Sequence, residues 1–251
     1  MKNNCFSPEE IIKELDKFLH RNDYENAEKY LLDWLCKSVE ADDVNIEILV
    51  RNELMGLYRK KGRKDEAFAM VEGVLEKISQ KGLHENVGSA TTYLNSATVY
   101  KAFSEPQKSI ALFERAKAIY EKSLNSNDPR FAGLYNNMAL TLVDLKRFDQ
   151  AFDLYERATS VIEEFPERAP DIAITYLNMA NAVEAQKGIE KAHEEITEYL
   201  KKAEEILENF PDKDGYYAFV CEKCASVFGY YGNFFYENEL KERARRIYEG
   251  N

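Results

Sequence analysis

Residues 135–158 read YNNMALTLVDLKRFDQAFDLYERA, and this stretch decides the fold because the chain repeats its pattern. A similar stretch, YLNSATVYKAFSEPQKSIALFERA, occupies residues 93–116, and YLNMANAVEAQK follows at 176–187. In each stretch apolar residues recur three and four positions apart, which is the spacing of one face of a helix. The sequence therefore predicts a series of amphipathic helices built on one template.

A small or apolar residue marks one fixed place in the first helix of every repeat. The residues at this place, called here the marker position, are Leu15, Met55, Ala97, Ala139, Ala180 and Ala225. Their successive separations are 40, 42, 42, 41 and 45 residues. A second small position marks the helix that follows in the first four repeats, at Ala27, Ala67, Ser109 and Ala151. Each repeat is therefore predicted to be a pair of helices, and small residues let neighbouring helices approach to about 8–10 Å.

Helix start signals fall where such pairs need them. Ser7 is a predicted cap with Pro8 at the first helical position, and Asp128 with Pro129 repeats this arrangement. The stretches between paired helices are short and polar or contain Gly or Pro. We predict a single solenoid over residues 1–251 with six units, approximately at 8–41, 44–83, 86–126, 129–166, 169–211 and 214–251.

The spacing of the marker residues resembles the tetratricopeptide repeat, W-x-x-L-G-x-x-Y, then A-x-x-x-F, then A. Residues 54–74 and 139–158 are most similar to it, and the resemblance covers residues 8–249. Because the period exceeds the usual ~34 residues, the chain is most similar to the longer-helix type found in kinesin light chain and related bacterial proteins. The resemblance implies an all-α, right-handed superhelical solenoid of about six helix pairs.

The charge balance restricts the class of partner. The formal net charge is −11, so phosphate backbones and anionic membrane surfaces are repelled on average. We therefore expect neither nucleic acid nor a membrane as a partner. The basic run Lys241, Arg243, Arg245 and Arg246 is interpreted as a solvated helix face.

The cysteines and the amino terminus indicate a cytoplasmic protein. No signal-peptide core and no membrane-spanning stretch is recognisable in the sequence. Cys5, Cys36, Cys221 and Cys224 are few and scattered, so reduced thiols are expected. Cys221 and Cys224 form a C-x-x-C pair, but no second pair and no suitably spaced His follows it, so we interpret both as buried packing residues.

Asparagines share one place in the predicted inner helices. If the marker alanine packs between helices, the residue two places before it points toward the groove of the solenoid, and these residues are Asn95, Asn137 and Asn178. An amide both donates and accepts hydrogen bonds, so a row of them can hold a peptide backbone whatever its side chains. The predicted peptide-binding residues are Asn52, Asn95, Asn137, Asn178, Asn181, Lys101 and Tyr230. The alternative is that the amides join adjacent repeats or only solvate the groove.

Charged groove positions are less informative. The cationic carboxylate clamp of chaperone-binding tetratricopeptide proteins is not evident, because the neighbouring positions are Asp16, Glu53, Thr98, Leu140 and Glu184. A C-terminal acidic tail is therefore not the expected ligand. Arg59, Lys60 and Lys101 could still seat an isolated carboxylate.

The stretch YYAFVCEKCASVFGYYGNFFY, residues 216–236, holds nine aromatic residues. We assign Phe228 to the core, and Phe219 and Tyr230 to the groove. The other aromatics suggest a homodimer through the C-terminal repeat, or only a thicker final core layer.

No catalytic motif is recognisable, so the chain is predicted to be a non-catalytic protein- or peptide-binding module without cofactor or metal. The first alternative is a self-associating scaffold. A second is a peptide-sensing regulator resembling the quorum-sensing receptors of Gram-positive bacteria. Since those that control DNA usually carry a preceding DNA-binding domain, direct DNA control is not expected with seven residues before the first helix.

Overall fold

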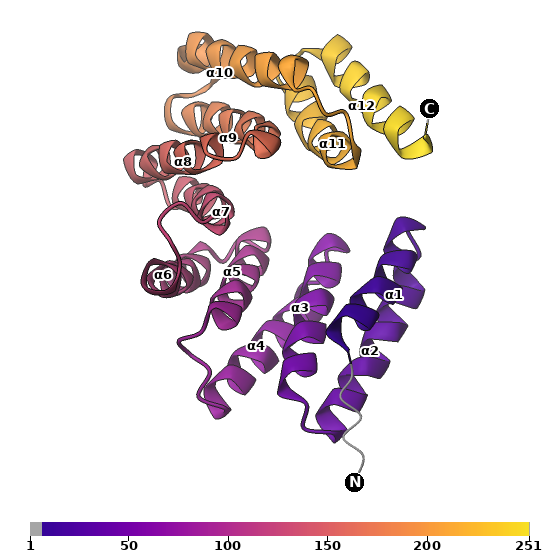
Figure 1. Cartoon of the computed structure of the whole chain (residues 1–251). Coiled ribbons are helices and arrows are strands. Elements are labelled where there is room, and N and C mark those ends of the chain that lie inside the picture. Colours follow the sequence, from indigo (N-terminus) through magenta and orange to yellow (C-terminus); the bar gives the residue numbers. More distant parts are fainter. Residues whose placement is uncertain (1–6, 251) are drawn as a thin grey trace. The chain divides into compact units, whose positions relative to one another are not determined.

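The computed structural model describes residues 7–250, and Cys5 lies outside this range. These residues form twelve α-helices, one 3-10 helix and no strand (Figure 1). The helices are α1 Pro8–His20, α2 Tyr24–Glu40, α3 Val44–Lys60, α4 Lys64–Gln80, α5 Val87–Ala102, α6 Pro106–Ser123, α7 Arg130–Asp144, α8 Phe148–Glu163, η1 Pro166–Arg168, α9 Pro170–Lys187, α10 Ile189–Asn209, α11 Gly215–Tyr230 and α12 Phe234–Glu249. The predicted all-α class is confirmed.

Consecutive helices pack as pairs in the manner of a tetratricopeptide superhelix, with α1 on α2, α3 on α4, and so on to α11 on α12. The chain divides into two compact units, Met1–Leu124 and Asn125–Asn251, so that the described helices α1–α6 belong to the first and α7–α12 to the second. That all six pairs form one solenoid stays a prediction.

The marker residues lie in the core of each unit, as the sequence predicted. Ala97, Ala139, Ala180 and Ala225 are fully buried, and Leu15 and Met55 are only 2% and 1% exposed. The second set, Ala27, Ala67, Ser109 and Ala151, is also fully buried. Because most of these places hold only a methyl or hydroxymethyl group, the paired helices can pack closely there.

Short polar side chains begin several helices. The backbone N–H of Glu10 donates to Ser7 Oγ at 3.4 Å, which confirms the predicted cap. Asp128 Oδ1 accepts from the N–H of Arg130 at 3.0 Å, and α7 begins at Arg130, one residue after the predicted position. The same kind of cap begins five other helices, from Asp23, Asp43, Asn86, Asp214 and Asn233.

Each turn inside a helix pair contains one residue with positive φ. These residues are Asn22, Gly62, Ser104, Lys146, Gly188 and Gly232, and they recur with the period of the marker residues. Glycine adopts this conformation without steric cost, whereas a side chain at Cβ is strained there. A positive φ is therefore kept at this place even where the sequence has Asn, Ser or Lys.

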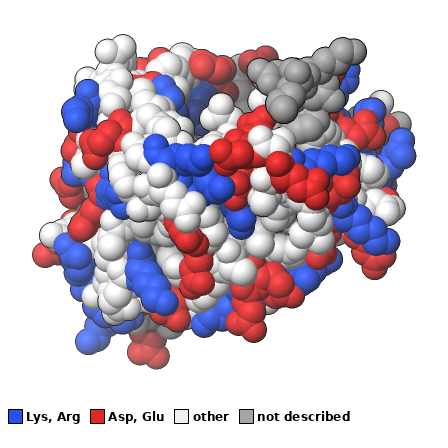
Figure 2. Space-filling view, turned by 90° about the horizontal axis from the view of Figure 1, so that it is seen from below, with Lys and Arg blue, Asp and Glu red and all other residues white. Residues whose placement is uncertain are grey.

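The charged residues are mixed rather than segregated on the face that Figure 2 shows, where lysine and arginine side chains alternate with aspartate and glutamate. On α12 each member of the basic run is paired with glutamates. Lys241 lies 2.5 Å from Glu237, and Arg246 lies 3.0 Å from Glu242. Between residues 7 and 250, no helix combines the length and the apolar character that a membrane crossing requires.

Candidate peptide-binding site

A cavity of about 380 Å³ lies in the second unit and collects residues from the inner helices α7, α9 and α11. We call it the asparagine cavity, because Asn136, Asn137 and Asn178 all line it. Its size falls in the range of about 300–1,000 Å³ that is usual for ligand sites. The apolar part of its wall includes Leu140, Ile162, Ile174, Leu177, Phe219 and Val227.

Two of the predicted site residues, Asn137 and Asn178, are brought together in this cavity. Both precede a fully buried marker alanine by two residues, so the packing of Ala139 and Ala180 turns the two amides to the same side of the unit. Lys223 precedes Ala225 by the same two residues and lines the same cavity. The inner helices therefore present a row of Asn137, Asn178 and Lys223.

A second row of asparagines, three places before the marker residues, connects neighbouring pairs. In the first unit Asn52 Nδ2 donates to Thr92 Oγ1 at 3.0 Å, and in the second Asn136 Nδ2 donates to Thr175 Oγ1 at 2.9 Å. Both bonds join the same two positions of successive inner helices. The amides of Asn52 and Asn136 thus join adjacent repeats, which was the alternative role considered for the asparagines.

Two side chains of the asparagine cavity have polar groups without a partner within residues 7–250. The side chain of Asn178 makes no hydrogen bond, and the buried Oδ1 of Asn136 accepts none. Asn137 Nδ2 donates to its own helix, to Gly133 O at 2.8 Å. An unsatisfied buried acceptor costs about 1–3 kcal/mol, so this wall favours a water or ligand that donates to it.

The charges of the cavity come from three side chains. Arg168 Nη2 lies 2.8 Å from Asp171 Oδ2, so these two charges are matched. Lys223 Nζ lies 5.1 Å from the centroid of the Phe219 ring, and Phe219 is 46% exposed. Among the described residues, Lys223 has no carboxylate partner within ion-pair distance. The cavity therefore carries one unmatched positive charge.

Farther along α9, Tyr230 bonds Glu184 directly, and Asn181 is connected to Glu184 through Tyr231. Tyr230 Oη donates to Glu184 Oε1 at 2.8 Å, and Tyr231 Oη lies 2.8 Å from Glu184 Oε2 and 2.9 Å from Asn181 Oδ1. Burial, and then the hydrogen bond to Glu184, raises the pKa of Tyr231. Asn181 is thus engaged within the fold, whereas Tyr230 is 65% exposed.

The first unit carries the other predicted residues, Asn52, Asn95 and Lys101. Asn95 Nδ2 donates to Asn52 Oδ1 at 3.0 Å, so the two amides form a chain across α3 and α5. Lys60 Nζ donates to Tyr24 Oη at 2.6 Å. Lys101 is half-buried, and within residues 7–250 it has neither a hydrogen bond nor an ion pair.

The C-x-x-C pair lies in the core of the second unit. Cys221 and Cys224 are fully buried, and burial raises the pKa of both thiols. They are therefore packing residues, as predicted, and remain protonated at neutral pH. In the described part of the chain no three His, Cys, Asp or Glu side chains come together as metal ligands would.

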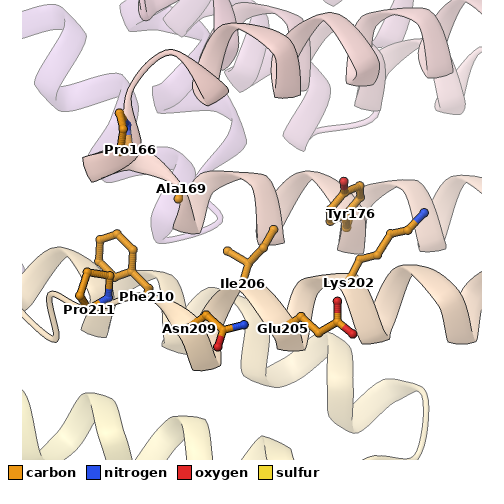
Figure 3. Close-up of a pocket in the computed structure, with 9 residues that line it drawn as sticks. All are labelled: Pro166, Ala169, Tyr176, Lys202, Glu205, Ile206, Asn209, Phe210 and Pro211. Atoms are coloured by element: carbon orange, nitrogen blue, oxygen red, sulfur yellow. The ribbon is translucent and has the colours of Figure 1, made fainter.

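A second cavity, of about 500 Å³, lies in the second unit between η1, α9 and α10 (Figure 3). Tyr176 and Lys202 stand at one end, with Phe210 and the two prolines, Pro166 and Pro211, at the other. Lys202 Nζ is matched by Glu198 at 2.5 Å. Because its one cation is already paired, this cavity presents less unmet polar chemistry than the asparagine cavity.

The predicted site residues, which were five asparagines with Lys101 and Tyr230, did not include Lys223 or Asn136. The signal for Lys223 was present, since it stands two places before a marker residue. The signal for Asn136 was the pair of threonines, Thr92 and Thr175, which share one register position.

Comparison with known proteins agrees with this architecture. Two family models, both described as Tetratricopeptide repeat, match residues 89–130 and 130–209. The chain is 26% identical to human Tetratricopeptide repeat protein 19, mitochondrial, over 73% of this chain and 53% of that protein. It is also 25% identical to the Clustered mitochondria protein homolog of Lodderomyces elongisporus, over 54% of this chain and 10% of that protein. The chain thus spans about half, or far less, of the curated relatives it matches.

Solved structures share the fold at lower identity. BtubC (BKLC) from P. vanneervenii superposes with a TM-score of 0.58 at 17% identity, over 92% of this chain and 91% of that one. TPR-like repeats of a kinesin light chain type from Podosopora anserina give a TM-score of 0.55 at 20% identity, over 78% and 92%. With its repeated helix pairs, its buried marker residues and the two family matches, the chain belongs to the tetratricopeptide repeat family.

Proposed function

We propose that the protein binds an extended segment of another protein in the asparagine cavity. The family supports the broad class, since tetratricopeptide repeats serve as protein–protein interaction modules. The observation that carries the finer proposal is a pair of polar groups without a partner among the described residues, the side-chain amide of Asn178 on α9 and the buried Oδ1 of Asn136 on α7. Such groups match the N–H and C=O groups of a peptide backbone, which has no fixed side-chain chemistry.

The spacing of the helices suits an extended chain. Adjacent inner helices lie about 8–10 Å apart, and an extended peptide advances about 3.3 Å per residue. Successive amides of the row can therefore hold every third peptide unit. The helices are packed before the ligand arrives, so the receptor loses little freedom on binding.

The test is selection of peptides from a random displayed library on the full chain, followed by fluorescence anisotropy. We expect the double variant Asn137→Ala, Asn178→Ala to bind a selected peptide at least tenfold more weakly with an unchanged urea midpoint, because Asn178 makes no bond within the fold. Asn238→Ala, an exposed amide on α12, is the matched control. Equal binding by the double variant and the control would refute the proposal.

A second candidate function is self-association through the aromatic residues of α12. Phe234 is 65% exposed and Phe235 is 81% exposed, whereas Phe228 and Tyr236 of the same pair are buried in the core. Exposed aromatic side chains that lie together are typical of interfaces. The double variant Phe234→Gln, Phe235→Gln would then remove a dimer that light scattering detects for the wild type. A wild-type monomer at high micromolar concentration would exclude this function.

We place the protein in the cytoplasm. The support is the set of thiols that the described residues leave free, Cys36, Cys221 and Cys224, which suits a reducing compartment. Because two relatives carry mitochondrial names, fractionation of the native cell is the deciding measurement, and recovery in mitochondria would contradict this assignment.

A further inference from the structure

We infer that Lys223 binds a side-chain carboxylate of the ligand, so that the asparagine cavity selects peptides with an aspartate or glutamate at one fixed place. This inference rests on the proposed function, which it makes more specific. Its starting point is the register: Lys223 takes the place on α11 that Asn137 takes on α7 and Asn178 takes on α9. The polar row therefore ends in an ammonium group instead of a third amide.

Among the described residues, no carboxylate pairs with the ammonium group of Lys223. Its ammonium group faces only the ring of Phe219, and the one carboxylate of the cavity, Asp171, is held by Arg168 through two bonds of 2.8 and 3.2 Å. By contrast, the cations on α12 are bound by glutamates. A positive charge left unmatched beside unmet amide groups complements an anionic group on the molecule that those amides hold.

The rest of the cavity indicates where that anion comes from. A chain-terminal carboxylate is usually held by several donors at once, but Arg168 is already committed to Asp171 and only one ammonium remains. A single Lys acts as a point charge and suits one side-chain carboxylate. Since α9 and α11 are neighbours at about 8–10 Å, the acidic residue is expected about three positions from the residue held by Asn178.

The experiment compares peptides selected on the full-length wild type, on Lys223→Glu and on Lys201→Glu. The library is acetylated and amidated, so that carboxylates come only from side chains. We expect the wild type and Lys201→Glu to enrich Asp or Glu at one position, and Lys223→Glu to enrich Lys or Arg there. Lys201 is the matched control because its side chain is 75% exposed on α10 and does not line the cavity. Both side chains are exposed, and thermal melts check that each variant is folded.

Affinities then separate this inference from the proposed function. For one selected acidic peptide, we expect Lys223→Gln to weaken binding about threefold and Lys223→Glu about tenfold, the range of partly exposed ion pairs. Replacing the acidic residue of the peptide by its amide, Asn or Gln, should also weaken binding to the wild type about threefold. The same replacement should not change binding to Lys223→Gln.

If the Lys223 variants select the same peptides as the wild type while Asn137→Ala, Asn178→Ala loses them, the inference is wrong and the proposed function stands. A carboxylate preference that appears only with a free C-terminus would also overturn it. If the wild type selects no peptide, the proposed function itself fails.

Discussion

Gly73 shows how a missing side chain makes room for a buried ion pair in the first unit. Glu47 is 1% exposed, and its carboxylate lies 2.9 Å from Arg51 and 2.9 Å from Lys77. A Cβ built at Gly73 of α4 would overlap the guanidinium group of Arg51. The absence of a side chain at Gly73 therefore lets the guanidinium group of Arg51 pack against α4 in the position where it pairs with Glu47.

We expect Gly73→Ala to destabilise the protein although alanine favours helix by about 1 kcal/mol. The methyl group pushes Arg51 away from Glu47, and a buried carboxylate that loses a partner costs about 1–3 kcal/mol. Gly56→Ala is the control, because Gly56 lies inside α3 with open space around its Cβ, and it should stabilise by about 0.5–1 kcal/mol. Urea unfolding measures both variants, and equal stabilisation by the two would show that Arg51 moves aside freely.

Glu53 is expected to reduce stability at neutral pH. Burial, and then repulsion from Asp16, raises the pKa of its carboxyl group in the folded state. A raised carboxyl pKa means that ionisation is harder in the folded than in the unfolded chain, so the cost is fully present above the folded pKa. It disappears as the pH falls below the ordinary value of 4.5.

Glu53→Gln should therefore unfold at a higher urea concentration than the wild type at pH 7, with the difference vanishing below about pH 4. Glu10→Gln, an exposed position on α1, is the control. A Glu53→Gln effect of the same size at both pH values would assign it to packing instead of charge.

The turns inside the helix pairs make a separate prediction possible. Lys146 lies between α7 and α8 with φ of 61°, at the position that Gly62 and Gly232 occupy in other pairs. The left-handed conformation costs a residue with Cβ about 1–2 kcal/mol, partly offset by the greater freedom of glycine in the unfolded chain. Lys146→Gly should stabilise by about 0.5–1 kcal/mol. Lys146 Nζ lies 5.8 Å from the centroid of the Phe148 ring. Thermal unfolding checks the prediction, and destabilisation would show that this contact contributes more than the backbone conformation.

The helix pairs could be predicted almost completely because their signal is periodic. The marker residues placed Ala139 and Ala180 in the core, and polar caps such as Ser7 fixed helix starts to within a residue. The sequence also predicted a row of polar side chains on the inner helices. What could not be predicted was which amides were already used inside the fold.

Asparagine side chains illustrate that limit. Asn136 and Asn137 are adjacent in sequence, but one bonds across to Thr175 and the other bonds its own helix. Their roles depend on the rotation of the helix and on the partner helix, neither of which a single repeat specifies. The unmatched positive charge of the cavity could not be predicted either, because whether Lys223 has a carboxylate partner depends on side chains from other helices.

At the scale of the whole molecule, we expect each of the two compact units to fold on its own as a separate fragment. Each compact unit has three helix pairs and its own buried cluster, with Ile46 and Val71 in the first and Leu177 and Phe228 in the second. In repeat proteins stability is close to a sum of repeat and neighbour terms, and the minimum of about three repeats that a stable core needs is present in each unit. Fragments 1–124 and 125–251 should therefore each show a cooperative urea transition by circular dichroism.

The two fragments are also expected to differ in peptide binding. Every residue that lines the asparagine cavity lies beyond Leu124. A peptide selected on the full chain should therefore bind fragment 125–251 within about threefold of the full-length affinity and should not bind fragment 1–124. Anisotropy measures both, after circular dichroism has established that each fragment is helical. A folded fragment 125–251 that binds more than tenfold weaker would mean that the ligand also depends on the first unit, where Asn52 and Asn95 form their own amide chain.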